Sequence, residues 1–254
     1  MSAADRGAPP LRRSLLRLFA VQGSYDYERM QGIGVGVAEE PLLRDLRAPG
    51  NGGGAAYRAA VARGARFFNA HPYLCGLAVG AVARAEHEGV PPEQVERLRA
   101  ALCGPLGSLG DRLVWVGWLP LTSALALIGV ALGLGLPAVL GFLVVYNAGH
   151  VALRWWALRA GWAHGIRVAA ALHQPVLQRA AALVGPAMAC AVGAALPLAA
   201  QYLSAPFAGW SRSALAVVAV GGVALLWWRR GKLTGLRFGL ALLAVATLVG
   251  ALWR

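Results

Sequence analysis

Apolar runs long enough to cross a lipid bilayer dominate the second half of this 254-residue chain. A helix needs roughly 20 mostly apolar residues to span a hydrocarbon core of about 30 Å. Five stretches meet or approach this length, and they cover residues 113–135, 137–157, 183–203, 213–228 and 236–253. The pattern therefore predicts an all-α, polytopic integral membrane protein with about five transmembrane helices.

Before residue 113 the apolar runs are too short to cross. Residues 11–19 place leucines near one side of a helix with arginines beside them, which is typical of an interfacial amphipathic helix. Residues 73–83 favour a re-entrant or buried helix, and the glycine-rich residues 31–38 suggest a short broken element. Residues 86–102 predict a helix introduced by two prolines. We therefore expect interfacial and re-entrant helices in the N-terminal half.

Charge divides the chain in the same way. Asp111 is the last of the eleven acidic residues, although the formal net charge of the chain is +13. A carboxylate in hydrocarbon is costly, so an acid-free apolar segment fits a bilayer. We expect residues 1–112 to form a cytoplasmic, interfacial and re-entrant region, and residues 113–254 to form the transmembrane region. The basic residues of the second half lie at the ends of apolar runs, which argues against binding to nucleic acid.

The distribution of basic residues also predicts an orientation. Arginine and lysine gather before residue 113 and in the loops 158–182 and 229–234, whereas the opposite loop at 204–212 contains only Arg212. The positive-inside rule then places the N-terminal region in the cytoplasm and the C-terminus outside it. Tryptophans near the ends of the proposed spans support these boundaries, because an indole ring prefers the headgroup level.

The sequence offers little sign of a reaction centre. Its three cysteines are widely spaced and lack any CxxC pattern. We find no P-loop, no Ser/His/Asp grouping and no metal-binding cluster in the sequence. We therefore expect no catalytic residue, metal or cofactor in this chain, and whether it counts as an enzyme stays open.

Four short strings of residues carry the functional signal. They are Tyr27-Glu28-Arg29-Met30-Gln31-Gly32, Phe67-Phe68-Asn69-Ala70-His71-Pro72, Gly104-Pro105-Leu106-Gly107-Ser108-Leu109-Gly110-Asp111, and Tyr146-Asn147 followed by Arg154-Trp155. In order and spacing, over roughly residues 15–167, the chain resembles the IID subunit of the mannose/fructose/sorbose family of bacterial phosphotransferase system (PTS) sugar permeases. It departs from that family at Ala70, where threonine is usual.

The resemblance implies a division of labour between subunits. A IID subunit works with a IIC membrane subunit to carry a hexose-type sugar inward, and a separate IIAB protein phosphorylates the sugar. The resemblance thus implies a hetero-oligomer in the bacterial cytoplasmic (inner) membrane, whose partners are the IIC subunit, IIAB, the sugar and the lipid bilayer. The alternative is a diverged, transport-inactive IID-like protein that serves as a membrane scaffold or regulatory interaction protein. Ala70 and the compact C-terminal third motivate this alternative.

Asn69 and His71 are the candidate sugar-binding residues. Pro72 marks the entry of a helix, because proline is favoured in the first helical turn. An amide and a neutral imidazole both offer donors and acceptors to sugar hydroxyls without introducing a buried charge. The alternative is that Asn69 only caps the helix and His71 bonds to nearby backbone.

Four further residues are candidates for contact with a partner or for the transport pathway. They are Gln31, Asp111, Asn147 and His150. Asp111 either caps the helix that follows it or lines the cytoplasmic mouth and meets a partner. Asn147, His150 and Arg154 share one helical face. We expect Arg154 to extend to the cytoplasmic interface, and Asn147 and His150 to contact another helix or a hydrated path.

Overall fold

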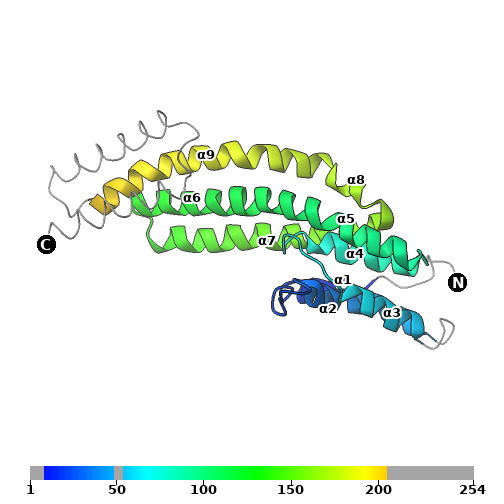
Figure 1. The fold of residues 1–254 in the computed structure, drawn as a ribbon. Helices are drawn as coiled ribbons and strands as arrows, with labels where there is room; N and C mark the ends of the chain where they lie inside the picture. Colours follow the sequence, from blue (N-terminus) through cyan, green and yellow to red (C-terminus); the bar gives the residue numbers. More distant parts are fainter. Residues whose placement is uncertain (1–8, 49–53, 205–254) are drawn as a thin grey trace. The chain divides into compact units, whose positions relative to one another are not determined.

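The computed structural model describes residues 9–48 and 54–204, and the part up to Ala199 belongs to one compact unit (Figure 1). Helices joined by turns make up the described residues, as the all-α prediction expects. The elements are α1 (Leu11–Leu18), α2 (Gly32–Leu43), the 3₁₀ helix η2 (Arg44–Arg47), α3 (Ala55–Gly64), α4 (Cys75–His87), α5 (Pro92–Gly110), the π-helix η4 (Asp111–Trp118), α6 (Leu119–Ala131), α7 (Leu136–His164), the 3₁₀ helix η5 (Gly165–Arg167), α8 (Ala169–Leu172) and α9 (Pro175–Ser204). The spans expected at 213–228 and 236–253 lie outside the described residues.

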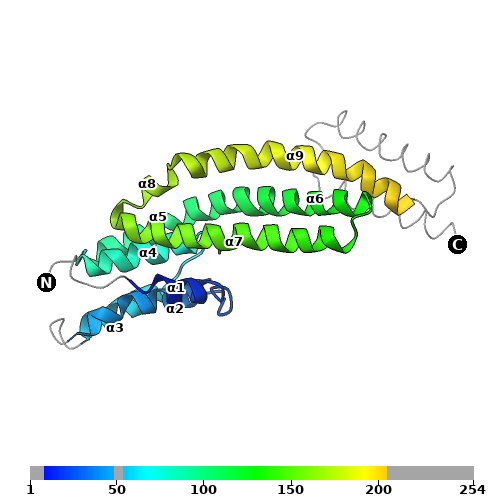
Figure 2. The ribbon, with the colours of Figure 1, turned by 180° about the vertical axis from the view of Figure 1, so that it is seen from behind.

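Among the described residues, three helical stretches are long and apolar enough to cross a membrane. They are Pro92–Ala131, which joins α5, η4 and α6; Leu136–Arg167, which joins α7 and η5; and Ala169–Ala199, from α8 and α9. Figures 1 and 2 show α6, α7 and α9 running side by side. Ala124 of α6 packs with Ala191 and Ala195 of α9, so small residues mediate one of these contacts. The three stretches overlap the first three spans predicted from the sequence, and the second lies wholly within its stretch.

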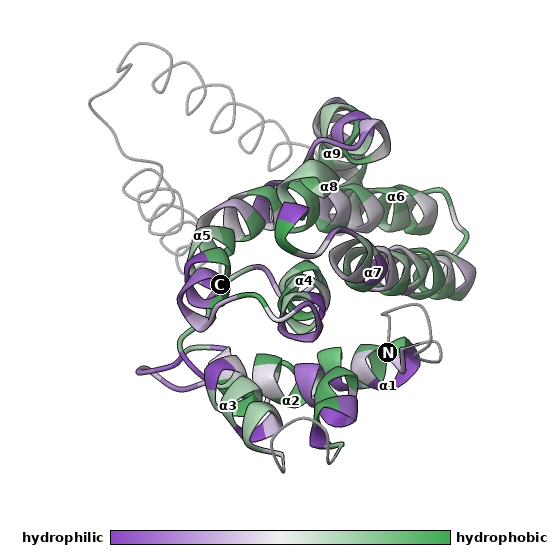
Figure 3. Ribbon diagram, turned by 90° about the vertical axis from the view of Figure 1, so that its right-hand side faces the viewer, coloured by the Kyte–Doolittle hydropathy of each residue, from purple (hydrophilic) through white to green (hydrophobic). Residues whose placement is uncertain are grey.

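The outer faces of α6 and α7 are apolar. Leu132, just after α6, and Leu136 and Val144 of α7 are each 68–69% exposed, and much of the α6 and α7 ribbon is coloured as apolar in Figure 3. Polar residues are more frequent in α1, α3 and α5. A water-facing surface rarely carries so continuous an apolar patch. These faces suit lipid or another membrane subunit.

The short helix α4 forms the centre of the unit. Figure 3 shows it between α5 and α7 and against the layer of α1 to α3. From Cys75 to Ala83 every residue of α4 is buried. Gly161 of α7 lies so close to α4 that an added Cβ would overlap the carbonyl oxygen of Leu77. Small residues let the two backbones touch, as they do between membrane helices. Residues 75–87 thus form a helix that is largely buried within the protein.

The glycine-rich segment 31–38 is helical, so the expectation of a broken element is wrong. It forms most of α2, with Pro41 inside the helix. An added Cβ on Gly34 would overlap the backbone of Val21, and one on Gly32 would overlap the carbonyl of Arg66. The glycines therefore allow neighbouring segments to pack closely against the helix, and this packing outweighs their weak helix propensity.

A buried ion pair joins α2 to α5. Arg99 donates to Glu39 at 3.1 Å, and the two side chains are 4% and 0% exposed. The Arg99 guanidinium also donates to the carbonyl oxygens of Gly64 and Arg66. Burial raises the pKa of Glu39 to about 7, and the Arg99 charge opposes that rise. This pair anchors the segment that leads to Asn69.

Candidate functional site

A polar pocket of about 880 Å³ lies between the turn that precedes α4 and the junction of α5 with η4. Four of the six residues predicted from the sequence line it: Gln31, Asn69, His71 and Asp111. The pocket thus brings together three of the four sequence strings, which are far apart along the chain. The other two candidates, Asn147 and His150, lie on α7 and do not line this pocket.

Gln31 shapes the turn at the edge of this pocket. Its backbone N–H donates to the carbonyl oxygen of Phe68 at 2.9 Å. Its side-chain Oε1 accepts hydrogen bonds from the backbone N–H of Ala70, at 3.4 Å, and from the thiol of Cys75, at 3.1 Å. Gln31 and Phe68 are buried, whereas Asn69 between these anchors is exposed. Gln31 therefore holds the turn in place and leaves the Asn69 amide at the rim.

Asn69 does not cap α4. The helix begins at Cys75, its N-cap residue is Leu74, and no side chain bonds to the cap. The carbonyl oxygen of His71 accepts hydrogen bonds from the backbone N–H groups of Leu74 and Cys75 instead. The capping alternative for Asn69 is therefore wrong, because a turn starting at His71 separates it from the helix.

His71 is buried, neutral and only partly hydrogen-bonded. Its Nδ1 accepts a hydrogen bond from the backbone N–H of Tyr73 at 3.2 Å, which assigns the ring proton to Nε2. Nε2 is buried without a hydrogen-bond partner. Burial lowers the pKa of His71 to about 4, with Asp111 opposing the change and Arg154 adding to it. The imidazole thus bonds to nearby backbone through one nitrogen and keeps one unused donor.

Asp111 lies inside a continuous helical stretch, so the expectation that it caps a following helix is wrong. α5 continues directly into η4 at Asp111, and no side-chain cap is present there. The three glycines and the proline before it are all helical, although they suggest a turn in sequence. Gly110 lies directly against His71, where an added Cβ would overlap the His71 side chain, whereas a Cβ on Gly104 or Gly107 would meet nothing within 4 Å. Asp111 is exposed and faces the pocket instead.

Two aromatic residues of the site are missed when the sequence is considered alone. Trp115 lines the polar pocket, with its ring centroid 5.1 Å from that of His71. Tyr73 meets His71 edge to face at 5.0 Å. The four-residue spacing between Asp111 and Trp115 is the signal that points to Trp115, because it places both on one helical face. From its position near the end of a proposed span, Trp115 is expected only at the membrane interface.

On α7, His150 and Arg154 belong to the wall behind the turn, whereas Asn147 does not. The His150 ring stacks on Tyr73 at 4.3 Å, and Arg154 Nε donates to His150 Nε2 at 2.9 Å. Arg154 is 4% exposed, so the expectation that it extends to the membrane interface is wrong. Asn147 is exposed, and its amide donates to the carbonyl of Leu143 on its own helix.

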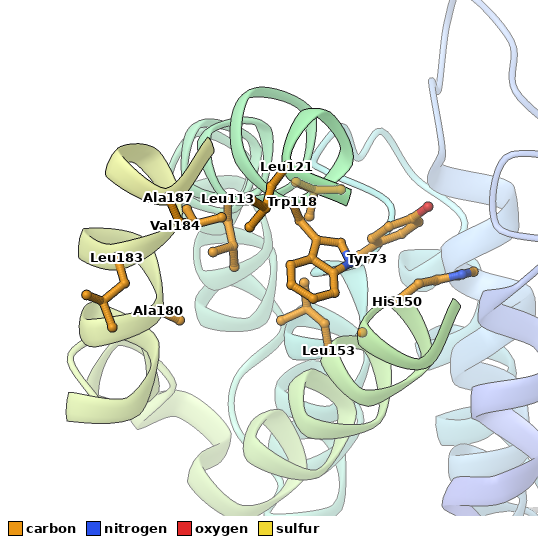
Figure 4. Close-up of a pocket in the computed structure, with 12 residues that line it drawn as sticks. Tyr73, Leu113, Trp118, Leu121, His150, Leu153, Ala180, Leu183, Val184 and Ala187 are labelled. Atoms are coloured by element: carbon orange, nitrogen blue, oxygen red, sulfur yellow. The ribbon is translucent and has the colours of Figure 1, made fainter. Parts of the chain in front are cut away.

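A second pocket, almost wholly apolar and about 350 Å³ in volume, lies on the other side of Tyr73 (Figure 4). Figure 4 shows Tyr73 and His150 at one end and residues of α9, including Leu183, at the other. Tyr73 lines this pocket but not the polar one. Of these two pockets, the one lined by His71 is therefore the more polar. Among the described residues, no group of three His, Cys, Asp or Glu side chains is placed to hold a metal.

We expect acid to destabilise the wild-type protein more than a His71→Gln variant. The ordinary imidazole pKa is 6.5, and that of folded His71 is about 4. Between these values the unfolded chain binds the proton that folded His71 refuses, so stability is lost as the pH falls through this window. Melting temperatures in detergent from pH 7 to pH 4 measure the effect.

His173→Gln is the matched control, because that histidine is exposed. It should follow the wild-type pH profile. Melting temperatures of wild type and His71→Gln that fall in parallel with pH would contradict the lowered pKa of His71.

The fold and the site together define a polytopic integral membrane protein with a solute-sized polar pocket beside its apolar helices. The sequence matches the model of the PTS system mannose/fructose/sorbose family IID component over residues 9–205. The match covers most of the chain, which therefore belongs to this family and is a membrane component of the IID type.

Curated relatives agree with this assignment. The sorbose-specific EIID component of Klebsiella pneumoniae is 31% identical over 169 residues, which are 65% of this chain and 60% of the relative. The mannose-specific EIID component of Escherichia coli (strain K12) is 28% identical over 163 residues, which are 62% of this chain and 56% of the relative. The chain thus matches less than two thirds of the length of each.

Solved structures share the fold. One, described only as a membrane protein, superposes with a TM-score of 0.70 and 21% identity, and the match covers 95% of each chain. A chain from the complex of the mannose transporter ManYZ with microcin E492 superposes with a TM-score of 0.56 and 21% identity, and covers 99% of this chain and 97% of its own. At this identity the likeness concerns the fold alone.

Proposed function

We propose that this chain works with a IIC membrane subunit to translocate a hexose-type sugar, while a separate IIAB protein phosphorylates the sugar. The observation that carries the proposal is the polar pocket, where Asn69, His71 and Asp111 meet beside Trp115. Membership of the family supports the division of roles between the subunits. The sorbose-specific and mannose-specific relatives support a hexose-type sugar as the substrate.

The chemistry of the pocket suits an uncharged sugar. The buried Nε2–H of His71 lacks an acceptor, which a sugar hydroxyl supplies. The exposed side chains of Asn69 and Asp111 offer further donors and acceptors. Trp115 provides an indole face for the apolar side of a pyranose ring. Because His71 is neutral near pH 7, the site does not require a charged ligand.

A hetero-oligomer in the bacterial inner membrane is part of the proposal. The outer faces of α6 and α7 carry exposed leucines and valines, and Asn147 is exposed on α7. A polar amide facing lipid is unfavourable, so we place Asn147 at the contact with the IIC subunit. We also propose that the N-terminal region is cytoplasmic and the C-terminus extracytoplasmic, from the arginine-rich loops.

Sugar uptake tests the proposed function directly. We expect Asn69→Ala and His71→Gln to lose most uptake of mannose, fructose or sorbose when co-expressed with IIC and IIAB subunits. Each variant removes hydrogen bonds to the sugar, and an unpaired buried partner costs about 1–3 kcal/mol. Both variants should still be captured by a tagged IIC subunit, because neither residue lies on α6 or α7.

The exposed His173 again supplies a matched control, and His173→Gln should transport normally. Normal uptake in Asn69→Ala and His71→Gln would refute the assignment of the pocket. Capture by IIC without uptake of any hexose by the wild type would favour the alternative of a transport-inactive scaffold.

A further inference from the structure

Arg154 is a buried cation that lacks a carboxylate partner in the described part of the chain. It lies on α7, within the stretch Leu136–Arg167 that is apolar enough to span a membrane. A buried charge is costly unless it is well hydrogen-bonded, so an arginine here needs a specific reason. Its contacts show what it holds together.

The Arg154 side chain joins three segments that are distant in sequence. Its Nη1 donates to the carbonyl oxygen of Leu18, at the end of α1, and to that of Pro72, at 3.1 Å. Its Nε donates to His150 Nε2 on its own helix. The planar guanidinium has donors on several edges, which a single ammonium group lacks. Arg154 therefore fixes α1 and the turn before α4 against α7.

The aromatic contacts of Arg154 involve the same segments. The guanidinium carbon lies 4.7 Å from the ring centroid of Tyr73 and 5.3 Å from that of Phe19. Tyr73 also stacks on His150, so its ring is held from two sides. Cation–π contacts gain strength when the cation is desolvated, as it is here.

These contacts lead directly to His71. Pro72, whose carbonyl Arg154 holds, follows His71 in sequence, and Tyr73, whose ring Arg154 covers, donates its backbone N–H to His71 Nδ1. That hydrogen bond leaves the proton on Nε2, the nitrogen without a partner. The geometry points to Arg154 as a positioning residue that fixes the sugar-binding turn and the tautomer of His71 from α7. The part of this inference that concerns sugar binding rests on the proposed function. The part that concerns the coupling of α7 to the turn before α4 does not.

The coupling links the pocket to a membrane-spanning helix. A displacement of α7 relative to α4 would move the Pro72 carbonyl and the Tyr73 ring together, and with them His71. The same displacement would pull on Leu18 and so on α1. Arg154 thereby makes the geometry of the turn depend on the position of α7.

Amide hydrogen exchange and sugar binding on the purified complex with IIC test this inference. We expect Arg154→Met to raise exchange in two separate segments, residues 17–24 and 69–75, while α2 remains protected. We also expect binding of the mannose, fructose or sorbose recognised by the wild type to weaken about tenfold or more, the effect of losing one or two good contacts. Arg154→Lys should be intermediate, with a raised KM for uptake and a retained maximal rate.

Arg159→Met is the matched control, because Arg159 is exposed on the same helix. It should show wild-type exchange and binding. Unchanged exchange of residues 69–75 in Arg154→Met would overturn the inference, as would exchange raised throughout the protein or sugar binding that is insensitive to the change. If Arg154→Met fails to fold, Arg154→Lys decides by the same two readouts. If the wild type binds no hexose, the proposed function fails and the exchange data alone decide the role of Arg154.

Discussion

Replacing Gly110 by alanine is expected to abolish hexose binding while leaving the transmembrane helices inserted. The new Cβ would overlap the side chain of His71, and both partners are fixed, one by the helix α5 and the other by the turn before α4. Relieving an overpacked contact of this kind costs about 1–3 kcal/mol. Since His71 lines the pocket, the relief displaces the donor that the sugar needs.

The direction of the change caused by Gly110→Ala distinguishes a steric clash with His71 from the effect of alanine on helix propensity. Alanine favours a helix over glycine by about 1 kcal/mol, so an alanine that met no neighbour would stabilise α5. Gly185→Ala is the matched control, because an added Cβ on this glycine of α9 meets nothing within 4 Å. Equilibrium binding of radiolabelled hexose to the purified complex measures both variants. Wild-type affinity in Gly110→Ala would contradict the close packing of His71 on α5.

Replacing Arg99 by methionine is expected to destabilise the N-terminal helical layer more than any other single change considered. Glu39 would then remain fully buried without its cation, and the carbonyl oxygens of Gly64 and Arg66 would lose their donor. Removing one partner of a buried ion pair typically costs about 3–5 kcal/mol. We expect a fall of roughly 10 °C in melting temperature in detergent.

Two comparisons make the Arg99 prediction specific. Arg97→Met removes an exposed arginine from the same helix and should melt close to wild type. The double replacement Glu39→Leu with Arg99→Met should be less harmful than Arg99→Met alone, because it removes the unpaired charge as well.

The Arg99→Met defect should also depend on pH. Burial raises the pKa of Glu39 to about 7 while Arg99 opposes the rise, so without Arg99 the pKa lies higher still and the carboxyl is neutral over a wider pH range. Folding then favours the protonated form, and stability is lost as the pH rises. Arg99→Met should therefore melt at a higher temperature at pH 6 than at pH 8, relative to wild type. An equal defect at both pH values would show that Glu39 is not the group left unpaired.

The spanning helices of the described residues follow from the sequence, whereas the geometry around the pocket follows only in part. Long apolar runs predict α6, α7 and α9 because burial in lipid depends mainly on local composition. The chemistry of Asn69 and His71 is also readable from residue type. Their neighbours are not, because Tyr73 and Trp115 reach His71 through packing between different helices.

Asp111 and Arg154 show why local rules fail near the site. Glycines and a proline before Asp111 predict a turn, but the segment is helical, and its Gly110 packs closely against His71, a residue distant in sequence. Arg154 near tryptophans predicts an interfacial side chain, but carbonyl oxygens from Leu18 and Pro72 draw it inward. Those carbonyls come from segments distant in sequence, so no local pattern announces them.

Photoaffinity labelling of the IIC–IID complex with a diazirine-bearing hexose, followed by mass spectrometry of the labelled peptides, tests the central claim most directly. We expect label on residues 67–75 and 104–115, competed by the unmodified sugar and lost in His71→Gln. Competed label confined to other segments of the complex, with these two peptides unmodified, would contradict it.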